Sequence, residues 1–116
     1  MVKKADTLEK VSVTALRGGD GELVKTILGT AEESFGHVTL FSTFTFPPKS
    51  SIGYHTHDAN CEYYYMLSGS LTLTEDGGAE TVLHPGDVSL CRDGHGHSVR
   101  NHTDSQAVML AMIVEK

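Results

Sequence analysis

Basic residues are scarce in this sequence, and it has no long apolar run. Nine Lys and Arg stand against fifteen Asp and Glu, which gives a formal net charge of −6. Because binding to phosphates requires a basic stripe and these nine residues are scattered, we expect no nucleic-acid partner. No segment approaches the apolar length that spans a bilayer, so we expect no membrane partner either.

Cysteine is also scarce, since the chain holds only Cys61 and Cys91. They form no CxxC pair and no dense disulfide pattern, which favours two free thiols in a reducing compartment, with a bridge between them left open. Residues 1–6 begin basic, meet an acid at Asp6 and lack the apolar run of a signal peptide. We therefore expect a cytoplasmic protein.

The chain length predicts one domain over residues 1–116, because 116 residues are too few for two ordinary cores. Hydrophobic residues make up 39% and charged residues 21% of the chain, which is typical of a globular protein. We see no internal repeat and no low-complexity linker. The chain is expected to fold by itself.

Turn-forming residues recur at short intervals, and the segments between them are rich in β-branched and aromatic residues. The expected strands lie within residues 11–14, 38–46, 63–67, 71–74 and 108–114. Asp and Gly in residues 75–78 predict a hairpin, and residues 30–34 are the one candidate helix. The pattern predicts an all-β fold, of the sandwich, jelly-roll or barrel type.

Two histidines and a glutamate form the central motif. His55 and His57 are two apart, and side chains two apart in a strand share a face, at a Cα separation of roughly 6 to 7 Å. The polar residues 58–60 allow the chain to turn back, so Glu62 at the start of the next strand can reach the same point. Two imidazoles and one carboxylate bind a transition metal and leave other coordination positions open.

A second motif lies downstream: Gly86-Asp87, then Gly94-His95-Gly96-His97, then Asn101. Taken together, the two motifs resemble the cupin superfamily, in its small single-domain form. The resemblance covers about residues 47–101 and rests on the paired spacing of His55-x-His57, Glu62 and Gly69 with Gly86, Gly94-x-x-His97 and Asn101.

The resemblance implies a jelly-roll β-barrel (a double-stranded β-helix), often built as a homodimer. N-terminal strands would occupy about residues 1–35 and the barrel core about residues 36–116. The implied metal ligands are His55, His57, Glu62 and His97, and Asn101 would have a structural role in its loop. The chain departs from the family pattern at Lys49, where a Gly is usual, and at Arg92, where a Pro is usual.

Two residues are candidates for proton transfer. His95 forms a second His-x-His with His97 and could compete for the ion or act as a proton shuttle, although a solvated histidine is an equal alternative. Tyr64 shares the face of Glu62 and could offer a hydroxyl to a substrate, although core packing is more frequent. Arg92 could bind a substrate carboxylate or phosphate. No base stands near Cys91, so we assign no covalent catalysis.

Three imidazoles and one carboxylate suit Mn, Fe, Co, Ni, Cu or Zn, and argue against Ca and Mg. We expect a metal-dependent protein that acts on a small oxygen-rich molecule, foremost as an oxidoreductase of dioxygenase or oxalate-decarboxylase type. The alternatives are a redox-neutral isomerase, cyclase or lyase, in which His95 or Tyr64 moves protons, and a non-catalytic small-molecule binding module. Fold-level analogy does not choose among them.

Overall fold

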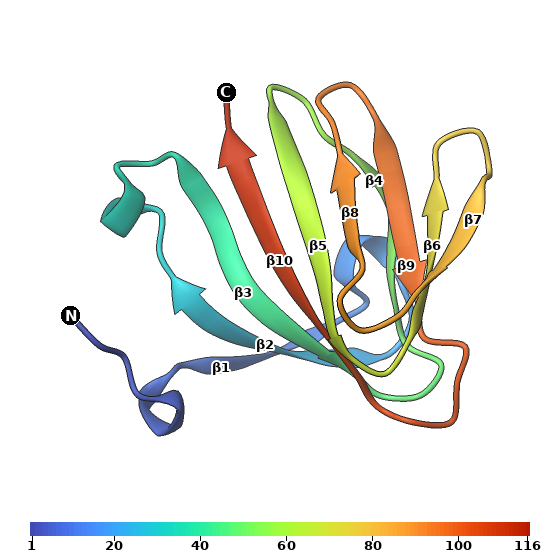
Figure 1. The fold of residues 1–116 in the computed structure, drawn as a ribbon, viewed down its shortest axis with the longest axis horizontal. Coiled ribbons are helices and arrows are strands. Elements are labelled where there is room, and N and C mark those ends of the chain that lie inside the picture. Colours follow the sequence, from blue (N-terminus) through green and yellow to red (C-terminus); the bar gives the residue numbers. More distant parts are fainter.

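Ten strands make up most of the regular structure in the computed structural model, which describes residues 1–116 (Figure 1). Six of them form one sheet, in the order β1 (Lys10–Thr14), β2 (Glu22–Gly29), β3 (Val38–Phe46), β10 (Ala107–Glu115), β5 (Asn60–Ser68) and β8 (Val88–Cys91). The other four form the second sheet, in the order β4 (Ser51–Thr56), β9 (Gly96–Arg100), β6 (Leu71–Glu75) and β7 (Glu80–Leu83). Three short 3₁₀ turns are η1 (Ala5–Thr7), η2 (Leu16–Gly18) and η3 (Glu32–Ser34).

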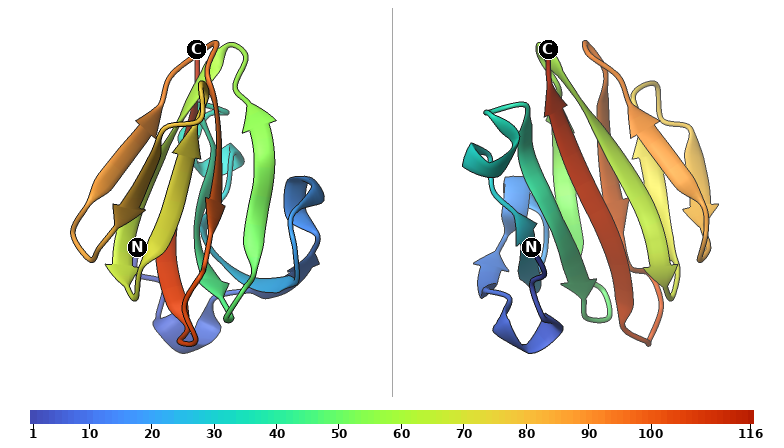
Figure 2. Two further views of the ribbon diagram at one scale, coloured as in Figure 1. Left: turned by 90° about the vertical axis from the view of Figure 1, so that its right-hand side faces the viewer. Right: turned by 60° about the vertical axis from the view of Figure 1, so that its left-hand side comes forward.

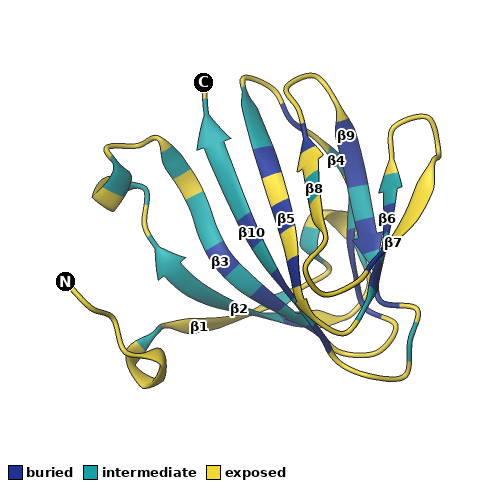
Figure 3. Ribbon diagram, in the orientation of Figure 1, coloured by how far each residue is buried: buried dark blue, intermediate teal, exposed yellow.

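The two sheets face each other and enclose the core, and all neighbouring strands are antiparallel (Figure 2). Along β5, buried and exposed residues alternate, with Tyr64 and Met66 inside and Tyr63 and Tyr65 outside (Figure 3). This period of two buries one face of each strand against the opposite sheet. The predicted all-β jelly roll is confirmed.

The core is a cluster of apolar side chains from both sheets. In the six-stranded sheet, the N-terminal strand β2 contributes Leu23. β3 contributes Phe44 and Phe46, and β10 contributes Met109 together with small alanines. The small residues on β10 leave room for the aromatic rings of β3 and β5, because a densely packed interior alternates large and small side chains.

The predicted hairpin at residues 75–78 joins β6 to β7, and Gly77 and Gly78 there take φ values of 87° and 89°. Only glycine adopts such angles without a steric penalty. The predicted helix at residues 30–34 is reduced to the single 3₁₀ turn η3. No helix in the structure combines the length and the apolar character that crossing a membrane would need.

The departure from the family pattern at Lys49 leaves the loop conformation intact. Lys49 has a φ of 67°, in the left-handed region that a glycine would occupy at no cost. Its backbone N–H donates to the carbonyl of Asn101 at 2.9 Å, and its Nζ donates to the carbonyl of His102 at 2.6 Å. These bonds hold the loop between β3 and β4 against the loop that follows β9.

Candidate metal centre

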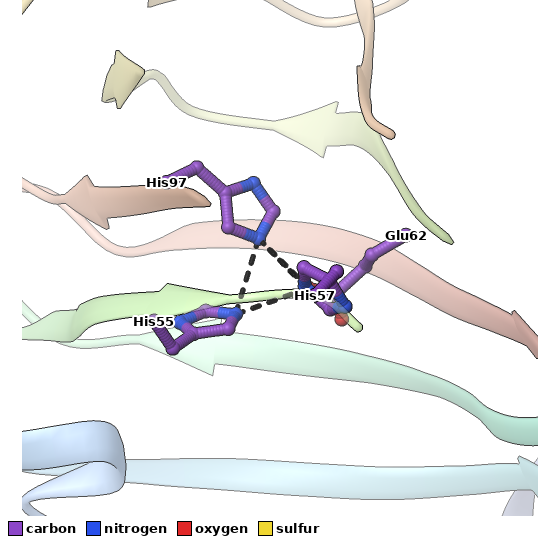
Figure 4. A group of neighbouring side chains, drawn as sticks. All are labelled: His55, His57, Glu62 and His97. Atoms are coloured by element: carbon purple, nitrogen blue, oxygen red, sulfur yellow. Dashed lines mark hydrogen bonds and ion pairs between the residues drawn. The ribbon is translucent and has the colours of Figure 1, made fainter. Parts of the chain in front are cut away.

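Four side chains from two sheets converge on one point inside the barrel (Figure 4). His55 lies on β4 directly opposite His97 on β9, so the strand register itself pairs these two imidazoles. His57 follows the last residue of β4, and its backbone N–H donates to the carbonyl of His95 at 2.9 Å, which keeps the chain extended there. His55 and His57 therefore share a face, as the spacing predicted.

Glu62 reaches this point from the opposite sheet. The chain turns back between β4 and β5 at Ala59, which takes a φ of 60° and donates its N–H to the Asp93 carboxylate at 2.6 Å. Glu62 then lies on β5 with its side chain directed inward, 3% exposed. The turn that the polar residues 58–60 predicted is thus the element that unites the two sheets at this site.

The donor atoms are spaced as ligands of one ion would be. Oε1 of Glu62 lies 3.3 Å from Nε2 of His55, 3.1 Å from Nε2 of His57 and 2.9 Å from Nε2 of His97. Nε2 of His97 lies 3.1 Å from that of His55 and 3.3 Å from that of His57. Metal–ligand distances of about 2.1 Å place adjacent octahedral ligands about 3.0 Å apart, so the group could hold a metal ion.

The hydrogen bonds of the outer ring nitrogens leave Nε2 of two imidazoles available to a cation at the centre. Nδ1 of His55 donates to the carbonyl of Gly53 at 2.9 Å, and Nδ1 of His57 donates to the side-chain oxygen of Asn60 at 2.8 Å. In a neutral imidazole, Nε2 is then an acceptor. Nε2 of each ring faces the oxygen of Glu62, and either a ring proton or a metal ion between the two atoms makes this arrangement favourable.

Charges around Glu62 keep it ionised. Burial by itself would raise the pKa of Glu62, but the hydrogen bonds from His55 and His97 and the nearby imidazole charges outweigh burial and lower the pKa to about 2. The pKa of His97 is lowered, chiefly by burial, which favours the neutral ring. An anionic carboxylate and neutral imidazoles are the forms that bind a metal.

The ring of His97 is held by stacking. Its Nδ1 is buried without a hydrogen-bond partner. The ring of Tyr64 lies parallel to it, with centroids 4.5 Å apart and planes 4° apart. Stacking on Tyr64 therefore gives His97 the orientation that hydrogen bonds give to His55 and His57.

We predict that Asn60→Ala lowers the affinity for Mn²⁺ by roughly 10- to 100-fold, because groups that orient a metal-bound histidine have effects of this size. Competition with a chelating dye measures the affinity. Asn60→Asp is the matched control, since its carboxylate still accepts from Nδ1 of His57, and it should bind Mn²⁺ about as tightly as the wild type. Equal affinity in all three proteins would show that Asn60 does not orient His57.

A cavity of about 160 Å³ adjoins the group and is lined by His55, Glu62 and Tyr64. Its wall is otherwise largely apolar: Val13, Leu16, Leu40, Phe44, Ile52 and Ile113. Two basic residues, Arg17 and Lys25, complete the lining. A small ligand that entered this cavity would meet the metal group on one side and positive charge on another.

Tyr64, one of the two predicted proton-transfer residues, lies both in the core and on this cavity, at 1% exposure. Burial, together with the negative charge of Glu62, raises the pKa of Tyr64 well above its ordinary value, and the charge of Arg17 offsets this only in part. Its hydroxyl therefore stays protonated at neutral pH and can donate a hydrogen bond.

His95, the second predicted proton-transfer residue, lines a different cavity of about 210 Å³, together with Arg92, Cys91 and His97. Its Nδ1 lies 2.9 Å from the carboxylate of Asp76, and its side chain is 57% exposed. His95 is not among the four converging residues, and Arg92 does not line the cavity that adjoins Glu62. We therefore do not place His95 among the candidate ligands.

Both cysteines are free, as predicted. Burial, with the negative charges of Glu62 and Asp76, raises the pKa of the Cys91 thiol to about 11. A thiol with such a pKa is a poor nucleophile at neutral pH.

Three residues of the site were not identified from the sequence. Asn60 lies in the predicted turn, and an amide three residues after His57 is a usable signal for a partner of that ring. Arg17 and Lys25 belong to the N-terminal segment, far from both motifs, and nothing in their sequence context marks them as part of the cavity.

A jelly roll in which three histidines and one glutamate converge defines the class of small β-barrel proteins with a potential metal centre. The chain belongs to the cupin family: the family model described as "Cupin domain" matches residues 42–113.

Among its relatives is an oxalate-binding protein of Thermotoga maritima, which is 31% identical over 114 residues, covering 98% of this chain and 93% of the relative. A crystal structure of a predicted oxalate decarboxylase from Thermotoga maritima superposes with a TM-score of 0.95 at 29% identity, over 100% of both chains. A sugar phosphate isomerase of the cupin superfamily from Silicibacter pomeroyi gives a TM-score of 0.77 at 22% identity, over 97% of this chain and 74% of that one, and this likeness concerns the fold alone.

Proposed function

We propose that this protein binds oxalate, or a similarly small dicarboxylate, at a divalent transition metal held by His55, His57, Glu62 and His97. The observation that carries the proposal is the position of the metal group at the wall of a cavity of about 160 Å³. Since water occupies about 30 Å³ in the liquid, this cavity has room for a ligand of only a few heavy atoms. The names of the Thermotoga maritima relative and of the superposed Thermotoga maritima structure support the same ligand class.

Four protein ligands leave two octahedral positions for such a ligand, and a metal bound there would act as a Lewis acid on its oxygens. Mn, Fe, Co, Ni, Cu and Zn all suit this donor set. The protein itself supplies a largely apolar wall and the hydroxyl of Tyr64 as a hydrogen-bond donor.

Turnover of the dicarboxylate by decarboxylation would require a proton on the carbon that loses CO2. Tyr64 is the residue we propose as the donor, because it lines the cavity beside Glu62 and His55. The dioxygenase-type reaction would instead consume oxygen. Redox-neutral isomerase, cyclase or lyase chemistry would draw on His95, which Asp76 orients on the other cavity.

Isothermal titration of oxalate into the Mn²⁺-loaded protein tests the binding. We expect saturable binding with one site per chain, and no binding to protein stripped with EDTA, because the chelated oxygens require the metal. Equal heats from loaded and stripped protein, or none from either, would contradict the proposal. Assays for formate, CO2 and oxygen uptake on the same samples then separate a decarboxylase, an oxygen-consuming enzyme and a binding protein.

The homodimer and the cytoplasmic location expected from the sequence stay predictions.

A further inference from the structure

Two positive side chains lie on the cavity that adjoins the metal group, in a protein whose net charge is −6. They are Arg17 and Lys25, and the only carboxylate in the cavity lining is that of Glu62. The ion pairs of the structure include neither of the two cations. Because Glu62 is directed to the imidazoles, this side of the cavity has positive charge without a partner.

The backbone that carries Arg17 is fixed against the strand that carries His55. Ala15 and Arg17 take φ values of 53° and 55°, a conformation that non-glycine residues keep only where surrounding contacts impose it. The contact is a close approach of η2 to β4: a Cβ at Gly53 would overlap the carbonyl oxygen of Arg17 at 2.1 Å. A Cβ at Gly19 would likewise lie 2.3 Å from the carbonyl oxygen of Ser51.

Lys25 reaches the cavity from β2. It is two residues from Leu23, which is fully buried in the core, so both side chains lie on the inner face of the strand. Its partner across the ladder is Phe44, which also lines the cavity. Lys25 is half-buried, so its apolar stem can pack beside this aromatic wall while its ammonium group remains available to an anion.

We propose that Arg17, assisted by Lys25, binds the outer oxygens of a metal-chelated dicarboxylate and so selects dicarboxylates over other chelators; this inference rests on the proposed function. Oxalate chelates a metal with one oxygen of each carboxylate, which leaves two oxygens on its far side. A guanidinium matches two such oxygens with parallel N–H donors. The cavity volume of about 160 Å³ suits a short dicarboxylate such as oxalate.

Titration of two ligands into the Mn²⁺-loaded protein tests the role of Arg17. Chelated oxalate keeps two outer oxygens, whereas acetohydroxamate chelates the metal with both of its oxygens and has none left over. We expect Arg17→Gln to weaken oxalate binding by roughly 10- to 100-fold, the effect of losing charge-assisted hydrogen bonds. Acetohydroxamate binding should change by less than about twofold, because it has no partner for the guanidinium.

Two further variants sharpen the test. Arg92→Gln is the matched control, since Arg92 lines the other cavity, and it should bind oxalate as the wild type does. Gly19→Ala keeps Arg17 but displaces the η2 backbone, so it should weaken oxalate binding and spare acetohydroxamate.

The outcomes distinguish the role of Arg17 from the proposed binding of oxalate. If the wild type binds oxalate and Arg17→Gln binds it equally well, the role of Arg17 is overturned and the proposed function stands. If Arg17→Gln weakened the binding of oxalate and of acetohydroxamate equally, the role of Arg17 would also be overturned, because the defect would then lie at the metal. If the wild type binds acetohydroxamate but not oxalate, the proposed function fails, and this inference fails with it.

Discussion

His57→Ala should lose most of the bound metal and leave the barrel folded. Removal of His57 takes away one of the four candidate ligands. We therefore expect the affinity for Mn²⁺ to fall by more than about 100-fold, which exceeds the effect of losing a group that only orients a ligand. Elemental analysis of the freshly purified protein measures the metal content. We expect about one ion per wild-type chain and very little in the variant, with an unchanged circular dichroism spectrum.

His95→Ala is the matched control for this experiment. His95 also belongs to a His-x-His pair, but it lies on the other cavity and outside the converging group. It should keep its full metal content. Binding to the folded state also stabilises a protein, by about 2.7 kcal/mol at a ligand concentration 100 times Kd. Added Mn²⁺ should therefore raise the Tm of the wild type and of His95→Ala, but not that of His57→Ala. Full metal occupancy in His57→Ala would refute the ligand assignment.

Asn101→Ala should be among the most destabilising substitutions in the chain. Asn101 is 0% exposed, and its Nδ2 donates to the carbonyls of Phe46, Pro47 and Ser105 at 3.1, 3.3 and 2.8 Å. Its Oδ1 accepts from the backbone N–H and the hydroxyl of Thr103. Alanine would leave these groups without their partner, and we expect a loss of about 3 to 5 kcal/mol in the free energy of unfolding.

Urea unfolding measures this loss. Thr103→Val serves as the control, because it removes one hydroxyl from the same network and should cost only about 1 kcal/mol. Since Asn101 contacts none of the four metal-binding candidates, Asn101→Ala should keep its metal content below the unfolding transition. A loss under about 1 kcal/mol would show that the loop does not depend on this side chain.

Local features of the sequence predicted β1, β3, β5, β6 and β10 and brought His55, His57 and Glu62 together. They did not predict β2 or β8, and His97 entered through the resemblance to the cupin superfamily. Side chains two apart share a face in any strand, so His55 and His57 could be placed together before their strand was paired. The turn at residues 58–60 and the stretch from residue 38 to residue 46 were likewise visible, because turn-forming and β-branched residues act over a few positions.

His95 has the same His-x-His spacing, but this spacing left its role open between binding the ion, proton transfer and a solvated side chain. Its spacing from His97 equals that of His55 from His57, yet its side chain is half-exposed and lies beside Asp76. The difference comes from the strands: β9 begins at Gly96, so His95 lies in the preceding loop, where alternation does not fix the direction of a side chain.

The sequence by itself determined the all-β class and the placement of His55, His57 and Glu62, because each depends on short spacings. His97 as a candidate ligand and the structural role of Asn101 came from the resemblance to the cupin superfamily. Only the tertiary structure decided which residues surround the ligand cavity. Arg17 and Lys25 reach it because β2 pairs with β3 and because η2 packs on β4 where Gly19 and Gly53 have no side chain. Such placement depends on contacts between segments far apart in the chain, and no local pattern encodes the path that brings them together.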